Sequence, residues 1–115
     1  MLDCKTQLVK SLNAILPTYY ELFCDSSTPK PCITYIESQN NIVANGDTLG
    51  YSTVGYTIKL WGTDLAILMP YTNKIDTTMR DLGYARTAYN ELTFNGNYEL
   101  IFTYQGLGLE NFNNN

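Results

Sequence analysis

One segment limits the possible folds of this chain more than any other. From Ser52 the residues alternate between two faces, with Val54, Tyr56, Ile58 and Leu60 on one side and Thr53, Gly55, Thr57, Lys59 and Trp61 on the other. Side chains of a β-strand point alternately to opposite faces, so this pattern predicts a strand over residues 52–61 with one face buried.

A helix is predicted directly after this strand. Apolar residues recur at helical spacing from Leu65 to Leu82, Gly83 provides a stop, and Thr63 or Asp64 is suited to cap the first turn. Pro70 lies too deep for the first turn of a helix that begins at residue 64. Either the first turn is separate and Pro70 begins the main helix, or the helix kinks there.

The remaining segments extend the pattern on both sides. Residues 3–16 carry apolar residues at helical spacing and predict an amphipathic helix that ends at Pro17, and residues 32–38 predict a strand. Residues 84–89 and 98–104 predict two more strands, joined by a turn at Asn95-Gly96. The predicted fold class is therefore α+β, an antiparallel β-sheet with a long hairpin, packed on one face by two α-helices.

The long hairpin connection is the polar stretch QNNIVANGDTLG, residues 39–50. It is too long for an ordinary hairpin turn, and long connections are often functional. We expect this loop to be a mobile arm that orders on a neighbouring subunit or partner, although a solvated tip without a partner fits the composition too. The candidate interface residues are Trp61 and, in the loop, Ile42, Val43, Asn45, Gly46, Asp47 and Leu49.

The length of the chain limits the number of domains. The 115 residues suit a single domain, which we place at 1–107, followed by a polar tail at 108–115.

Three cysteines, Cys4, Cys24 and Cys32, are an odd number without CxxC spacing, and no secretory leader is apparent. We expect structural thiols in a reducing compartment.

Composition argues against several classes of function. The chain has 7 basic and 11 acidic residues, a net charge of −4, and no run of basic residues, so we expect no stable nucleic-acid binding. No apolar run is long enough to span a bilayer, and no membrane association is expected. Histidine is absent, which removes the commonest general base and the commonest zinc ligand. We expect a protein that is not an enzyme and uses no cofactor or metal.

Aromatic residues indicate protein contacts instead. Ten tyrosines are many for a chain of this size. Tyrosine suits partly buried surfaces, because its ring can be buried while its hydroxyl stays hydrogen-bonded. Cross-strand packing and subunit contacts both use such residues. Trp61 has the same two alternatives, packing within the subunit or contact between subunits.

The order of these motifs resembles a known family. A leading helix, a PCITYIES strand, a polar loop with Asn-Gly-Asp, a YTIKLWGTD strand that ends in Trp61, and a helix that closes in DLGY are similar to the tail-completion or tail-terminator proteins of long-tailed bacteriophages. The resemblance covers roughly residues 5–105. The C-terminal stretch GLGLENFNNN has no counterpart in it.

The resemblance implies a structural protein of the virion neck. Such a protein forms a homo-hexameric ring that caps the tail tube and joins it to a head-side connector or stopper protein, and DNA passes through the ring without stable binding. Assembly in the host cytoplasm and a place in the virion follow from the same resemblance. The alternative from the residues alone is a monomeric α+β adaptor domain that binds one protein partner without catalysis.

Overall fold

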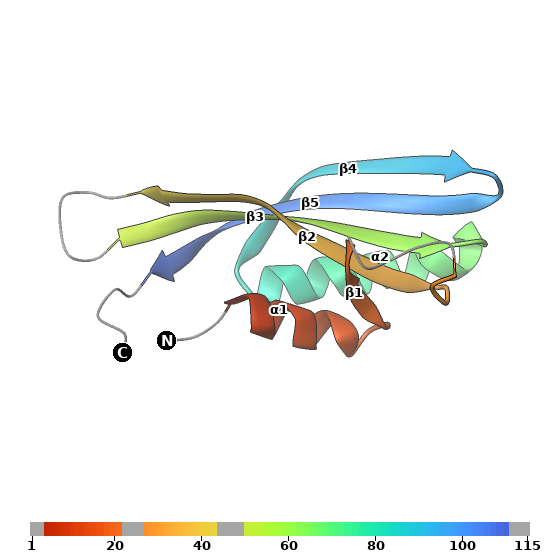
Figure 1. Cartoon of the computed structure of the whole chain (residues 1–115), viewed down its shortest axis with the longest axis horizontal. Helices are drawn as coiled ribbons and strands as arrows, with labels where there is room; N and C mark the ends of the chain where they lie inside the picture. The colour runs from red at the N-terminus through yellow and green to blue at the C-terminus, as the bar shows by residue number, and fades with distance from the viewer. Residues whose placement is uncertain (1–3, 22–26, 44–49, 111–115) are drawn as a thin grey trace.

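In the computed structural model, the chain forms a five-stranded sheet with two helices on one of its faces (Figure 1). The structure describes residues 4–21, 27–43 and 50–110, and at residues 4, 39–43, 50–53 and 107–110 it describes the backbone alone. The elements in chain order are α1 (Cys4–Asn13), β1 (Thr18–Tyr20), β2 (Cys32–Val43), β3 (Gly50–Gly62), α2 (Leu65–Asp81), β4 (Tyr84–Phe94) and β5 (Asn97–Glu110).

The strand order is β1-β2-β3-β5-β4, so β1 and β4 are the edges. β2, β3, β5 and β4 pair antiparallel, as predicted, and the α+β class is confirmed. β1 was not predicted as a strand, and it pairs parallel with β2, from Thr18 opposite Ile33 to Tyr20 opposite Tyr35. A three-residue strand is too short to show an alternating pattern, which is why the sequence did not reveal it.

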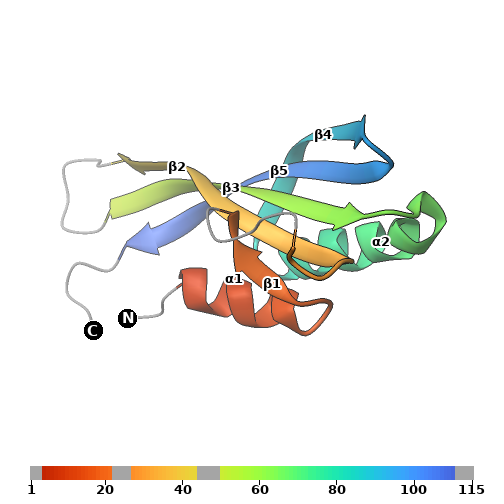
Figure 2. The ribbon, with the colours of Figure 1, turned by 45° about the vertical axis from the view of Figure 1, so that its right-hand side comes forward.

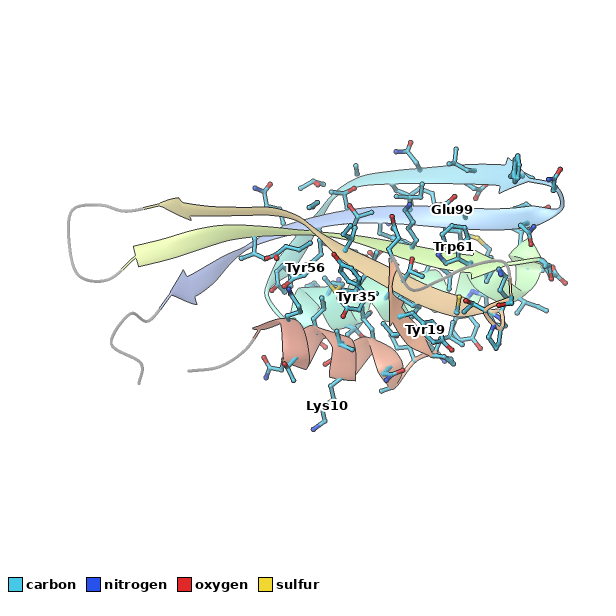
Figure 3. The ribbon with its side chains drawn as sticks, viewed as in Figure 1. Lys10, Tyr19, Tyr35, Tyr56, Trp61 and Glu99 are labelled. Atoms are coloured by element: carbon cyan, nitrogen blue, oxygen red, sulfur yellow. The ribbon has the colours of Figure 1, made fainter. Side chains whose placement is uncertain are left out.

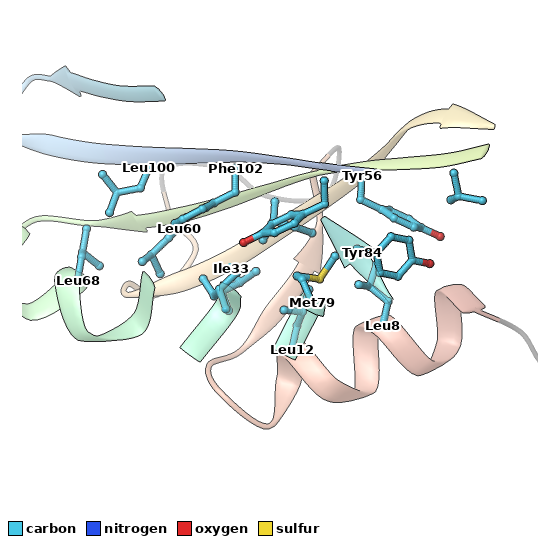
Figure 4. Packing of buried hydrophobic residues seen from close by; sticks show 14 residues of the cluster. Leu8, Leu12, Ile33, Tyr56, Leu60, Leu68, Met79, Tyr84, Leu100 and Phe102 are labelled. Atoms are coloured by element: carbon cyan, nitrogen blue, oxygen red, sulfur yellow. The ribbon is translucent and has the colours of Figure 1, made fainter. Parts of the chain in front are cut away.

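The core lies between the sheet and the helices (Figures 2 and 4). The predicted buried face of β3 is confirmed. Its four residues are at most 6% exposed: Val54, Tyr56, Ile58 and Leu60. Leu100, Phe102 and Tyr104 of β5 lie beside them and are buried as well. The helices cover this layer with Leu8 and Leu12 of α1 and with Leu68, Ile75 and Met79 of α2.

Local signals set the ends of α2 and of the last hairpin. Asp64 caps α2, because its Oδ1 accepts a hydrogen bond from the Ala66 amide at 3.0 Å. Pro70 lies inside the helix, which runs without a break from Leu65 to Asp81. Between β4 and β5, Asn95 and Gly96 both have positive φ, 50° and 78°, as the predicted two-residue turn requires.

The polar stretch 39–50 differs from the prediction of a long loop. Residues 39–43 continue β2, Gly50 already belongs to β3, and only 44–49 lie between the two strands. β3 has a partner on each side here, because Val43 pairs with Tyr51 and Gly50 pairs with Glu110. Residues 39–43 bond their backbone groups to β3 whatever the polarity of their side chains, so polarity alone was a poor guide.

The far ends of β2, β3 and β5 form a three-stranded extension that reaches beyond the helices (Figure 1). It includes Gly108 to Glu110, so β5 runs three residues into the segment expected to be a polar tail. We call this extension the arm; it consists of residues 41–43 of β2, 50–53 of β3 and 107–110 of β5.

Candidate functional site

Trp61 lies on the face of the sheet opposite the helices and makes contacts within its own subunit (Figure 3). Its indole Nε1 donates a hydrogen bond to Thr34 Oγ1 on the neighbouring strand β2 at 2.8 Å, and Thr34 is fully buried. The Lys59 ammonium lies 5.8 Å from the centre of the indole ring. Of the two predicted roles for Trp61, these contacts support packing within the subunit.

A charge cluster surrounds Trp61 on this outer face. Lys59 Nζ is 3.0 Å from Glu99 Oε2 on β5 and 3.2 Å from Glu21 Oε1, which follows β1. Burial alone lowers the pKa of Lys59, but the hydrogen bonds and charges of Glu99 and Glu21 outweigh it and leave that pKa raised. Lys59 therefore stays charged at neutral pH and serves as the centre of an ion-pair network rather than as a base.

Two of the other predicted interface residues, Ile42 and Val43, belong to the arm. Ile42 and Val43 are in β2, where they pair with Ser52 and Tyr51. Asn45, Gly46, Asp47 and Leu49 lie outside the described residues. The structure therefore does not bring Ile42 and Val43 together with Trp61, which is at the other end of β3.

Of the cysteines, Cys32 is fully buried at the start of β2, where it faces the side of the sheet that carries Trp61. For Cys4 only the helical backbone is described, and Cys24 lies outside the described residues.

A second polar cluster, which the sequence did not reveal, lies between α2 and the sheet. The Tyr104 hydroxyl of β5 donates a short hydrogen bond to Asp76 Oδ1 of α2, and Arg86 Nη1 of β4 is 3.1 Å from Asp76 Oδ2. Burial and the adjacent Asp76 carboxylate raise the pKa of the Tyr104 phenol well above its usual range. Through these contacts with Asp76, the cluster joins α2 to β5 and β4.

Exposed apolar side chains gather on one edge of the sheet. Tyr89, Leu92 and Phe94 of β4 are 38%, 52% and 74% exposed, and every described residue of β4 after Tyr84 is exposed. On α2, Ile67 and Met69 are also exposed. Sequence reasoning missed this surface, because it ended the predicted strand at residue 89 and assigned no strand to residues 90–94.

A shallow open groove lies beside α1. Lys5, Thr6, Val9, Lys10 and Asn13 of α1 line it, together with Tyr35 of β2. Val9 and Tyr35 are half-buried, and the two lysines are exposed. We call it the α1 groove.

Within residues 4–21, 27–43 and 50–110, no group of three or more His, Cys, Asp or Glu side chains is placed to hold a metal ion. No helix in the described part of the chain is long and apolar enough to cross a membrane.

Comparisons with known proteins show similarity at the level of the fold. No protein-family model matches the chain, and no curated relative matches it in sequence. Among solved structures, it is similar to a chain in the virion of a native gene transfer agent particle, with a TM-score of 0.60 and 9% sequence identity. The similar region covers 91% of this chain and 91% of that chain. At this identity, the likeness shows a shared fold over nearly the whole length of both proteins.

Proposed function

We propose that this chain is a structural protein of a phage-like virion. The observation that carries the proposal is the likeness to a virion chain of a gene transfer agent particle, which covers 91% of each chain and leaves no large region of either unmatched. A fold by itself does not determine function. Here the resemblance of the sequence to tail-completion proteins supports the same class of function independently of the fold comparison.

Within the virion, we propose a place at the neck. The chain would form a ring, a homo-hexamer in the related family, that caps the tail tube and contacts a head-side connector or stopper protein. The net charge of −4 supports this place. A negatively charged ring has few cationic side chains to neutralise DNA phosphates, so it would not hold the genome as it passes. We propose no catalytic role and no cofactor, consistent with a sequence that has no histidine.

The experiment deletes the gene for this chain from the genome that encodes the particle and examines the lysate by electron microscopy. We expect separate DNA-filled heads and unjoined tails, with joining restored when purified protein is added. Normal joined particles in the deletion strain would overturn the neck role. A purified protein that is monomeric and binds neither tubes nor heads would instead favour the adaptor alternative.

The arm is our proposed docking element for the tube or the head-side partner. It extends beyond the helices, so it can reach a neighbour without moving the core (Figure 1). Replacement of residues 44–49, which connect β2 to β3 in the sequence, by a two-residue Asn-Gly turn leaves the helices and their buried layer intact. We expect a protein of unchanged stability that no longer joins heads to tails, and unaffected joining would show that docking occurs elsewhere.

A further inference from the structure

We propose that the free edge of β4 binds an extended segment of another protein, which adds to the sheet as a further strand. We call residues 88–94 of β4 the β4 edge. The bound segment carries a cationic side chain opposite Glu91 and, at the adjacent position, an apolar side chain opposite Leu92. The inference goes beyond the proposed function, because strand addition requires a partner segment and no particular place in the virion.

The backbone of the β4 edge is open on one side. β4 is an edge strand, and within the described part of the chain its one partner in the sheet is β5. Its pairing with β5 is regular from Ala88 to Phe94, because the register shift comes earlier, between Arg86 and Ala88. A strand paired on one side presents a row of backbone N–H and C=O groups on the other, and an added strand can pair with that row.

The β4 edge lacks the features that usually protect edge strands. Proteins protect such strands with proline, lysine, a bulge, or cover by a helix or loop. Residues 88–94 contain no proline, no lysine and no register shift, and all of them are exposed. Leu92 and Phe94 are 52% and 74% exposed. A long edge with exposed apolar side chains is a site for association.

The two faces of the β4 edge favour different side chains in a partner. Glu91 pairs with the buried Leu100 and is on the helix side of the sheet, whereas Leu92 pairs with Glu99 and is on the side of Trp61. Residues directly opposite each other in paired strands share a face, and neighbours along a strand alternate between faces. A strand added at this edge therefore places adjacent side chains beside Glu91 on one face and beside Leu92 on the other.

Glu91 favours a cation in the partner. It is the one charged residue from Thr87 to Tyr98, and it forms no ion pair with another described residue. The Tyr89 hydroxyl donates a hydrogen bond to Glu91 Oε2 at 3.3 Å, and a carboxylate can accept further bonds. Opposite charges across a strand pair are stabilising, whereas like charges are destabilising. The partner segment therefore carries lysine or arginine at this position.

The C-terminal residues cannot reach the β4 edge. Residues 111–115 follow Glu110, which ends β5 in the arm. The part of β5 from Glu99, which pairs with Leu92, to Glu110 is about 36 Å long. Residues 111–115 span about 18 Å at most when fully extended. They are too short to pair beside Leu92.

The other segments outside the described residues are also too short. Residues 44–49 are held at both ends by the arm, and residues 1–3 precede α1 and span about 11 Å at most. Residues 22–26 are held at both ends and reach out about 11 Å at most. They follow Glu21, whose contact Lys59 on β3 is three strand spacings, about 14 Å, from a strand added beyond β4. None of these segments can cover the β4 edge of its own copy.

Charge disfavours a second copy as the partner. Two copies that pair antiparallel about Asn90 or Glu91 bring their Glu91 carboxylates diagonal or directly opposite to each other, where like charges are destabilising. Each copy also has a net charge of −4, which adds repulsion. A segment of a different protein with a cation at this position avoids both costs.

The test measures binding of synthetic peptides to the purified chain by fluorescence anisotropy. The lysine peptide alternates valine and threonine, with one central lysine in place of a threonine, and carries methyl groups on alternate backbone nitrogens so that one edge alone can pair. The blocked peptide has the same side chains and a methyl group on every backbone nitrogen, so neither edge can donate hydrogen bonds. The glutamate peptide has the methylation of the lysine peptide and glutamate in place of lysine.

Four variants locate the binding site. Glu91→Lys and Leu92→Lys each change one face of the β4 edge. The matched controls are on α2: Asp81→Lys changes an exposed acid, and Ile67→Lys changes an apolar side chain that is 54% exposed. All four positions are exposed, and circular dichroism checks that the variants fold as the wild type does.

We expect saturable binding of the lysine peptide to the wild type and to both controls. The blocked peptide should bind about tenfold more weakly or worse, because backbone hydrogen bonds supply most of the affinity in strand addition. Glu91→Lys should reverse the preference and bind the glutamate peptide about tenfold more tightly than the lysine peptide. Leu92→Lys should weaken the binding of the lysine peptide. Hydrogen exchange should show new protection at alternate amides of residues 88–94 in the complex.

Strand addition would be overturned by a lysine peptide that does not bind at its highest soluble concentration, by equal binding of the lysine and blocked peptides, or by protection at a site other than β4. Protection of residues 88–94 in the chain without peptide, together with self-association, would identify a second copy as the partner and overturn a separate protein.

These outcomes are distinguishable from a failure of the proposed function. Peptide binding at the β4 edge, together with normal joined particles after the gene deletion, would support strand addition and overturn the neck role. A joining defect in the deletion strain without peptide binding would do the reverse.

Discussion

β4 and β5 are neighbours in the sheet and pair along almost their whole length, yet they differ sharply in burial. Leu100, Phe102 and Tyr104 of β5 are at most 1% exposed, whereas every described residue of β4 after Tyr84 is exposed. Both strands have paired backbones and aromatic side chains. The difference comes from the helices, which cover β3 and β5 but contact β4 only near its start, where Tyr84 is buried and Arg86 meets Asp76 of α2. Backbone pairing therefore determines the shape of the sheet, and helix cover determines which part of it is a core.

The largest test of this comparison replaces one phenylalanine on each strand. Phe102→Ala should lower the free energy of unfolding by about 3–5 kcal/mol, because Phe102 is fully buried and its removal leaves a cavity. Phe94→Ala should change it by less than about 0.5 kcal/mol, because that ring is 74% exposed. Urea denaturation of the purified proteins measures both. Similar losses at the two positions would mean that β4 is covered in solution.

A smaller effect is expected where the covered strand is tied to its helix. Tyr104→Phe removes the hydrogen bond to the Asp76 carboxylate and should cost about 1.5–3 kcal/mol at neutral pH. Thermal unfolding at neutral pH checks this value. A loss of unfolding free energy below about 0.5 kcal/mol, as for a substitution at an exposed site, would show that Arg86 alone holds Asp76.

The same residue predicts a pH dependence. The raised pKa of Tyr104 means that its phenol stays protonated in the folded chain while it ionises in the unfolded chain, where its ordinary pKa is 10.0. The stabilisation is fully present below pH 10 and is lost as the pH rises above it, by up to about 1.4 kcal/mol per pH unit. Stability measured from pH 8 to 11 should fall less steeply in Tyr104→Phe. Equal slopes in the two proteins would contradict the assignment.

The boundary between covered and uncovered sheet is tested at Gly106. An added Cβ there would lie 2.8 Å from the Gly83 carbonyl oxygen and 2.8 Å from Tyr84 Cδ1, so the chain between α2 and β4 would have to shift. We expect Gly106→Ala to cost about 1–3 kcal/mol. Hydrogen exchange should show the loss of protection centred on the β4–β5 pairs near Tyr84, and an unchanged protein would mean that this junction is loosely packed.

The smallest predicted effect concerns the helix cap. Asp64→Ala removes the acceptor for the Ala66 amide and should cost about 1 kcal/mol. Asp64→Asn keeps a side-chain oxygen and should stay close to wild type. Thermal unfolding of the pair checks this, and equal losses would show that the charge of Asp64, rather than its hydrogen bond, stabilises α2.

The residues that alternate or recur with a regular period were sufficient to predict most of the fold. The buried face of β3 and the Asn95-Gly96 turn follow from local rules and are confirmed, and of the two predicted caps, Thr63 and Asp64, the structure shows Asp64. The candidate site was less accessible to this reasoning. Trp61 was identified as notable, but its partner Thr34 lies 27 residues away and is reached only through the pairing of β2 with β3.

The sequence alone determined the α+β class, the two helices and the buried face of β3, because side-chain periodicity and turn chemistry are properties of neighbouring residues. The tertiary structure decided the rest. Residues 39–43 became strand because β3 offered a paired backbone, and Tyr104 met Asp76 because α2 packs over β5. The exposure of Leu92 and Phe94 was decided in the same way, since an apolar residue in a strand is buried only where another layer covers it, and no helix covers this end of β4.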